Sequence, residues 1–228
     1  MGTTSLFDDK ASTYDDFCET PLGHFVDVVE HEMVAAIARP QQGESAIGLG
    51  CGTGSYTYWL YDMGLSVVGV DVSPNMLEVA RHKRENSVIF LQADLVHLPF
   101  DDDTFDLAIC NAVLEFTDDP AAVLREGFRV VKPGGRLVVG CINRNGAWGR
   151  RYVKRGKEDP TSIYDHAQFF SFADISRMRP GQPSDARFGL YTGPNEFHDF
   201  DTSMQLERHL EGQQLEAGYF AVRWDKNS

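Results

Sequence analysis

The sequence predicts an α/β protein in which strands and helices alternate around a mostly parallel sheet. Short apolar or β-branched runs at 45–49, 66–70, 88–91 and 105–110 are typical of buried strands. Strands that alternate with helices favour right-handed crossovers and therefore parallel neighbours. The separating segments expected to be helical are 55–63, 73–84 and 120–130.

Further elements are expected on both sides of this alternation. Val26, Val29, Met33 and Ile37 recur at helical spacing, in a helix that Arg39-Pro40 ends. Phe7, Ala11, Tyr14 and Phe17 have similar spacing and predict a shorter amphipathic helix. The remaining expectations are a turn at 133–135, strands at 136–142 and 219–224, and helices at 172–178 and from Met204 to Leu215.

Composition limits the class of function. The chain has 228 residues, 42% of them hydrophobic, which is enough for the core of one domain. A formal net charge of −13 disfavours a nucleic-acid partner. No apolar run is long enough for a membrane span, and the N-terminus has no signal-peptide pattern, so we expect a cytoplasmic protein. The four cysteines form no CxxC pair and the seven histidines no ligand grouping, so no metal is expected.

A glycine loop between the first strand and the next helix carries the strongest local signal. Gly48-Leu49-Gly50-Cys51-Gly52-Thr53-Gly54 suits a ligand lying against the backbone, although tight strand-to-helix turns also use glycine structurally. Asp71 ends the second strand, where a carboxylate can accept both hydroxyls of a ribose. Asp94 ends the third strand and could accept a hydrogen bond from the amino group of an adenine, with Leu95 and Met76 packed against the faces of the adenine ring. A turn or helix cap is the alternative for either aspartate.

The glycine spacing argues against a dinucleotide. A dinucleotide site needs G-x-G-x-x-G, whereas the loop from Gly50 has G-x-G-x-G, and neither other register fits. The pattern suits a nucleoside with a short amino-acid tail, and a nicotinamide oxidoreductase is disfavoured.

The ordered motifs resemble those of class I S-adenosylmethionine (SAM)-dependent methyltransferases. The resemblance covers about residues 44–142 and extends to small bacterial methyltransferases of the type-11 kind, whose substrates are generally unassigned. It implies a Rossmann-like fold: a seven-stranded, mostly parallel sheet with an antiparallel last strand and helices on both faces. The motifs are Gly50-Cys51-Gly52-Thr53-Gly54, Val68 to Leu77, Ala93-Asp94-Leu95 with Leu98-Pro99-Phe100, Phe105-Asp106, and Arg129 to Gly135.

The resemblance also implies a cofactor and a layout. SAM would be bound, with S-adenosylhomocysteine (SAH) as product, by Gly50, Cys51, Gly52, Thr53, Gly54, Asp71, Val72, Met76, Asp94, Leu95, Asn111 and Tyr14. Asn111 would lie near the methionine part or the methyl group, and Tyr14 on a helix that closes over the cofactor. We expect one domain over 1–228: an N-terminal helical cap (1–40), the SAM-binding core (41–142), a substrate-side insert (143–193), and a C-terminal helix and last strand (194–228).

One position departs from the family pattern. Gly48 stands where the family normally carries Asp or Glu, a carboxylate that organises the loop near the SAM amino group. Two functions follow as alternatives: a methyltransferase for a small molecule, by O-, N- or S-methylation, or a SAM-binding protein of the same fold with weak or lost catalysis.

The acceptor side rests on the segment after residue 142. Residues 144–157 hold six basic and no acidic side chains, which would suit an anionic small molecule, with a solvated helix face as the alternative. Trp148 would supply an apolar wall, and His166 and His24 are candidates for proton transfer, but no residue stands out as a catalytic base. The substrate-side candidates are Glu115, Asn143, Arg144, Trp148, Arg150, Arg151 and His166.

Overall fold

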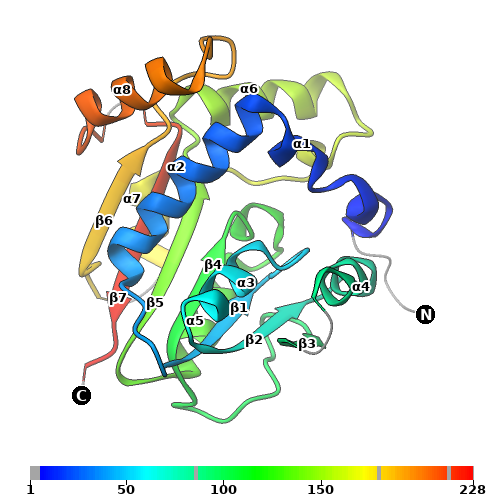
Figure 1. Cartoon of the computed structure of the whole chain (residues 1–228), viewed down its shortest axis with the longest axis vertical. Helices are drawn as coiled ribbons and strands as arrows, with labels where there is room; N and C mark the ends of the chain where they lie inside the picture. Colours follow the sequence, from blue (N-terminus) through cyan, green and yellow to red (C-terminus); the bar gives the residue numbers. More distant parts are fainter. Residues whose placement is uncertain (1–5, 85–86, 179–180, 215–216, 228) are drawn as a thin grey trace.

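The fold is built on one seven-stranded sheet, which the computed structural model describes for residues 6–84, 87–178, 181–214 and 217–227 (Figure 1). The strand order is β3-β2-β1-β4-β5-β7-β6. Strand β7 alone is antiparallel to the other six strands, and it pairs with both β5 and β6. This confirms the predicted fold class. The strands are β1 (Ser45–Leu49), β2 (Ser66–Asp71), β3 (Ile89–Gln92), β4 (Phe105–Asn111), β5 (Val131–Ile142), β6 (Asp185–Gly189) and β7 (Tyr219–Asp225).

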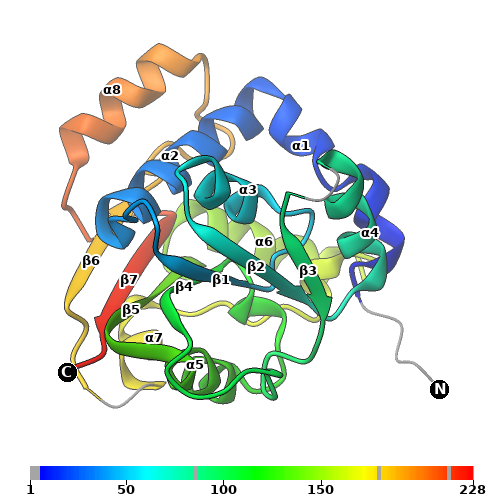
Figure 2. The same cartoon turned by 60° about the horizontal axis from the view of Figure 1, so that its bottom comes forward.

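Helices cover both faces of the sheet, as Figure 2 shows for α2 and α3 on one face and α5 and α7 on the other. Two hydrophobic clusters lie between the sheet and these layers, so alternate residues of each strand are buried on opposite faces. The helices are η1 (Asp8–Thr13), α1 (Asp16–Glu19), α2 (Pro21–Ala38), α3 (Ser55–Asp62), α4 (Pro74–Lys83), η2 (Leu114–Phe116), α5 (Pro120–Arg129), α6 (Ala147–Glu158), η3 (Ile163–Asp165), α7 (Phe172–Met178) and α8 (Phe200–Leu210).

The helix ends follow the capping residues in the sequence. Thr20 accepts a hydrogen bond from the Gly23 N–H at the start of α2, and Ser73 accepts one from Met76 at the start of α4. Proline occupies the first turn of both helices. Arg39 takes a left-handed conformation after α2, and Pro40 follows it, which ends the helix where the sequence predicts.

Two expected elements differ in form. The single amphipathic helix expected from Phe7 to Phe17 is two short pieces, η1 and α1, because side chains there bond to distant groups instead of continuing one helix: Ser73 donates to Asp8, and Thr53 to Asp15. The turn expected at 133–135 lies inside β5 and not before it. The strand begins at Val131, and its register with β4 is irregular at this point, which accommodates the extra residues.

The segment expected as an insert holds an unpredicted strand. Strand β6 follows α6, η3 and α7 and pairs with β7 at the edge of the sheet. It is mostly half-buried and includes Asp185 and Arg187, so it has no apolar run to reveal it. The late helix α8 ends at Leu210, and Leu215, expected in that helix, lies outside the described residues.

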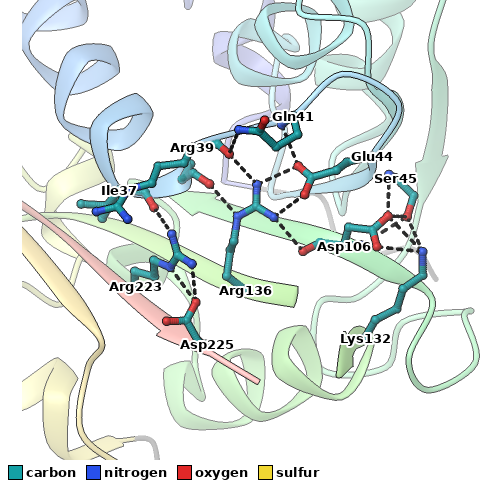
Figure 3. Close-up of polar contacts among 11 residues, drawn as sticks. Ile37, Arg39, Gln41, Glu44, Ser45, Asp106, Lys132, Arg136, Arg223 and Asp225 are labelled. Carbon is teal, nitrogen blue, oxygen red and sulfur yellow. Dashed lines mark hydrogen bonds and ion pairs between the residues drawn. The ribbon is translucent and has the colours of Figure 1, made fainter. Parts of the chain in front are cut away.

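A polar network holds the amino-terminal edge of the sheet, opposite the glycine loop (Figure 3). Arg136 makes two hydrogen bonds of 2.7 Å to the Glu44 carboxylate and donates to the carbonyls of Ala38 and Arg39. Arg136 is 6% exposed, so its buried guanidinium joins β5 to the end of α2 through the two carbonyls and to the start of β1 through the ion pair with the partly exposed Glu44. Nearby, Lys132 and Ser45 bind Asp106, whose pKa falls to about 2 because these hydrogen bonds outweigh its burial.

None of the helices in the described part of the chain is both long and apolar enough to span a membrane.

Candidate cofactor and acceptor site

The glycine loop needs glycine for its backbone conformation. Gly50, Gly52 and Gly54 have φ angles of 63°, 51° and 90°, which side chains rarely adopt. A Cβ added at Gly52 would meet no atom within 4 Å, whereas one at Gly50 would lie 2.5 Å from Val113 and one at Gly54 would lie 3.0 Å from Tyr58, so the loop backbone is open at Gly52. An open backbone surface in this position suits a ligand that lies along the loop.

Asp71 links the end of β2 to this loop. Its Oδ2 accepts from the Gly52 N–H at 2.8 Å, and its Oδ1 accepts from the Ser73 N–H at 2.9 Å. Burial raises the pKa of Asp71 in spite of these bonds. Each carboxylate oxygen can accept a further bond, so ribose hydroxyls could still be held. Val72, which follows, is 50% exposed.

The structure brings Asp94 to the same edge of the sheet. The Ala93 N–H donates to the Asp71 carbonyl, and Asp94 lies exposed just after it. The Asp94 Oδ1 accepts a hydrogen bond from the Val96 N–H at 3.1 Å. This is the geometry of a turn residue, which is the alternative to adenine binding for this aspartate. Leu95 and Met76 are buried, at 7% and 2% exposure.

The N-terminal cap fastens to the loop. The Thr53 hydroxyl donates to Asp15 at 2.7 Å, and Lys83 forms an ion pair with the same carboxylate at 2.7 Å. Tyr14 precedes Asp15 and is 44% exposed, yet desolvation of its hydroxyl raises the pKa well above the usual range. The cap therefore lies where the resemblance expects a closing helix. Burial also raises the pKa of Cys51, which keeps that side chain a thiol.

Gly48 has little room for a side chain. A Cβ there would lie 2.8 Å from the Thr57 Oγ1 and 3.5 Å from the Cys51 Cβ. The Thr57 hydroxyl is buried and has no hydrogen-bond partner among the described residues. Thr57 thus occupies the direction in which a carboxylate at position 48 would project.

A second carboxylate reaches this edge from α2, and the sequence did not reveal it. The Asn111 Nδ2 donates to the Glu30 Oε2 at 3.2 Å, and the Tyr219 hydroxyl donates to the Asn111 Oδ1. Burial raises the pKa of Glu30 to about 7, against the lowering effect of the Asn111 bond. Glu30 lies one residue after Val29 in an apolar helix, and only the packing of α2 across the sheet brings it to the end of β4.

A comparison with known families matches this cofactor side. The family model described as "Methyltransferase domain" matches residues 47–139, which span the glycine loop, Asp71, Asp94 and Asn111. The match therefore covers the central part of the chain, which is similar to a methyltransferase domain. SAM is the cofactor of this family, and the open loop and the free acceptor capacity of Asp71 fit it.

Individual proteins are also similar to this chain. The chain is 29% identical to an uncharacterised protein of Methanocaldococcus jannaschii, over 76% of this chain and 78% of that protein. It is 40% identical to a demethylmenaquinone methyltransferase of Corynebacterium kroppenstedtii, over 59% of this chain but only 57% of that enzyme. A solved Thermotoga maritima structure, described as a SAM-dependent methyltransferase and possible histamine N-methyltransferase, has the same fold, with a TM-score of 0.77, 24% identity, and 97% and 98% coverage of the two chains.

Three of the substrate-side candidates are interior residues. The Trp148 indole is 3% exposed and donates to the Thr192 carbonyl, and Asn143 donates to the Ala217 carbonyl at 2.7 Å. The Asn143 bond ties the start of the insert to the segment before β7, and the Trp148 bond joins two parts of the insert itself. Glu115 is fully buried; its Oε1 accepts from the Ile142 N–H, its Oε2 has no partner among the described residues, and burial raises its pKa to about 7.

The basic candidates lie on the outside of the protein. Arg150 donates to the Asn145 carbonyl, Arg151 donates to Asn195, and Arg144 forms an ion pair with Asp174. The His166 side chain is 70% exposed. Open surface hollows of about 440 and 560 Å³ lie along α6, but no predicted cofactor residue lines them. Within the described ranges, no hydrogen bond or ion pair joins these four side chains to a predicted cofactor residue.

His24, the second histidine considered for proton transfer, stacks on Phe200 with ring centroids 5.5 Å apart. Metal chemistry finds no support in the described ranges, where no group of three or more histidine, cysteine or acidic side chains is placed to hold an ion.

Proposed function

We propose that the chain transfers a methyl group from SAM to a small molecule. The observation that carries this proposal is the connection of Asp71 to the open glycine loop, because it offers a carboxylate for a ribose beside a backbone surface for an amino-acid tail. The demethylmenaquinone and ubiquinone relatives support a small-molecule acceptor, although their matches cover only part of their length.

The division of labour follows from the chemistry of the cofactor. When bound, SAM supplies a methyl group already activated on a sulfonium. The protein's residues then have to hold the acceptor in line with that methyl and exclude water. Asp71 and the loop would fix the nucleoside, while Asn111, at the end of β4, would define the reacting end. The N-terminal cap would cover the cofactor through the bonds of Asp15 to Thr53 and Lys83.

A binding protein without turnover is the second candidate, and Gly48 motivates it. Thr57 fills the place of the usual carboxylate with a hydroxyl, which carries no charge to hold an ammonium group. Binding and turnover must therefore be measured separately.

The experiment has two stages. A thermal-shift scan with SAM, SAH and NAD should stabilise the protein with the first two and not with NAD. A screen of small-molecule acceptors that measures SAH formation then separates the two candidates. Turnover on any acceptor supports the methyltransferase; SAM binding with no SAH formed across quinols, phenols, amines and thiols supports the binding protein. Stabilisation by NAD alone would contradict both.

A further inference from the structure

Position 48 and Asn111 project from the same face of the sheet. Strand β1 pairs in parallel with β4, and Gly48 lies opposite Ile109. Asn111 therefore stands level with Gly50, and it shares a face with Ile109 because side chains alternate along a strand. Ala46 and Ile109 belong to the hydrophobic cluster between the sheet and α2. A carboxylate at position 48 would thus point toward the face that α2 and α3 cover (Figure 2).

Helix α2 brings a carboxylate of its own to this face. The Glu30 Oε2 accepts from the Asn111 Nδ2 at 3.2 Å, and the Asn111 Oδ1 accepts from the Tyr219 hydroxyl. The Asn111 amide is therefore fixed from both ends, with its donor toward Glu30. Glu30 and Asn111 are both only partly buried. The carboxylate thus lies at the carboxyl edge of the sheet, beside the strand that leads into the glycine loop.

A ring contact places this part of α2 against the start of α3. His31, the neighbour of Glu30, stacks on Tyr56 with ring centroids 4.1 Å apart and an interplanar angle of 4°. Tyr56 lies in the first turn of α3, directly after the glycine loop. The next residue, Thr57, is the one whose hydroxyl occupies the space beside Gly48. Glu30 therefore lies close to the place that the carboxylate of the family pattern would take.

Glu30 has no cationic partner in the described part of the chain. No lysine or arginine there forms an ion pair with it, and its Oε1 accepts no hydrogen bond from the described residues. The Nδ1 of the adjacent His31 lies instead 3.2 Å from the Asp27 carboxylate. A carboxylate withdrawn from water is normally paired. Burial raises the pKa of Glu30 to about 7, which is the direction expected when no cation is present.

We propose that Glu30 takes over the role of the carboxylate that position 48 lacks, and that it accepts a hydrogen bond from the ammonium group of SAM. This inference rests on the SAM binding that the proposed function requires. The amino-acid tail would lie along the glycine loop, and its ammonium group would supply the cation that Glu30 lacks. Hydrogen bonds between charged groups are the stronger ones, so Gly48 does not leave the tail without a charged acceptor.

The other carboxylates around the loop are less suited to this role. Asp15 already forms an ion pair with Lys83. Asp71 accepts from two backbone N–H groups at the end of β2, on the side expected for the ribose. Glu115 is fully buried and binds the Ile142 N–H. Glu30 is the carboxylate of this group that is both partly accessible and without a cation.

The test compares three ligands that differ in the amino-acid tail. Calorimetry on the whole protein would use SAH, an analogue that lacks only the α-amino group, and 5′-methylthioadenosine, which lacks the whole amino-acid tail. The deaminated analogue is 5′-S-(3-carboxypropyl)-5′-thioadenosine. We expect the wild type to bind SAH about tenfold or more tightly than this analogue, because the analogue offers Glu30 no cation.

Glu30→Gln should remove this preference. The amide oxygen can still accept from Asn111, so the variant keeps that bond and loses the charge. SAH should weaken by about tenfold or more, while the deaminated analogue and 5′-methylthioadenosine bind at least as tightly as before. Glu32→Gln is the matched control, since Glu32 is an exposed glutamate on the other side of the same helix, and all three affinities should stay constant.

Three results would overturn the proposal. Equal binding of SAH and the deaminated analogue by the wild type would show that the ammonium group has no partner, and this result needs no variant. A Glu30→Gln protein that binds SAH as tightly as the wild type, or that weakens the deaminated analogue as much as SAH, would show that Glu30 does not act on the ammonium group. Failure of the wild type to bind SAH at all would refute the proposed function itself, so the two failures are distinguishable.

Discussion

Replacing Asp71 by asparagine should separate its role in ligand binding from its role in the loop. The amide has the shape of the carboxylate, but one of its two ends is a donor. Because both oxygens already accept backbone N–H bonds, from Gly52 and Ser73, the amide must turn its NH₂ group toward one of these donors. We expect a stability loss of about 1 kcal/mol from the lost loop bond.

The effect on affinity should be larger. A hydrogen bond to a charged group contributes about 1.5–3 kcal/mol, so losing the carboxylate from the ribose should raise the Kd of SAH roughly 10- to 150-fold. Calorimetry would measure this for SAH and for 5′-methylthioadenosine, which shares the ribose but lacks the amino-acid tail. Both should weaken by a similar factor.

Asp101→Asn is the matched control, since Asp101 is an exposed carboxylate in a turn. An Asp71→Asn protein that folds normally and binds both ligands as tightly as the wild type would refute the ribose assignment. A loss confined to SAH would show instead that Asp71 acts on the amino-acid tail.

Three further predictions concern other parts of the structure. Gly48→Asp alone should lower the Tm and should not increase SAH affinity, because its Cβ would lie 2.8 Å from the Thr57 Oγ1. The double variant Gly48→Asp with Thr57→Ala should bind SAH more tightly than Thr57→Ala alone. Tighter SAH binding by the Gly48→Asp single variant would contradict this reasoning. Burial raises the pKa of Glu115 from the ordinary 4.5 of a glutamate to about 7, so the folded state favours its protonated form and the stability that this side chain contributes should fall as the pH rises through this range. Urea unfolding should show Glu115→Gln gaining on the order of 3 kcal/mol over the wild type between pH 4 and pH 8, and an unchanging difference would contradict the shift. Arg136→Met should lower the free energy of unfolding by about 1.5–3 kcal/mol, because it removes two charge-assisted hydrogen bonds to the partly exposed Glu44. The loss should be smaller when Glu44→Gln is added, and SAH affinity should stay constant because the network lies at the opposite edge; equal stability of the single and double variants would argue against the pair.

The local parts of the fold were predictable because their causes are local. Ser73 caps α4 and Arg39-Pro40 ends α2 through bonds and backbone restrictions that span a few residues. Strand β6 could not be predicted, because its half-buried edge position needs no apolar run and its pairing comes from β7, more than 30 residues away along the chain.

The cofactor side of the site was predictable from the sequence to a greater extent than the acceptor side. The cofactor residues cluster at successive strand ends, and the parallel sheet brings Gly52, Asp71 and Asp94 to one edge wherever the chain folds as predicted. The acceptor side has no such rule. The run of basic residues was conspicuous in the sequence, but helix α6 buries Trp148 and leaves Arg150 and Arg151 on its outer surface.

The sequence by itself determined the class of the fold, the positions of its central strands along the chain and the strand ends at which the cofactor residues lie. These depend on hydrophobic periodicity and on turn and capping residues, which act over short stretches of chain. Only the tertiary structure decided that Glu30 meets Asn111 and that Thr57 fills the space beside Gly48. Such contacts join residues whose separation in sequence carries no pattern, because packing of helices across a sheet, and not local propensity, brings them together.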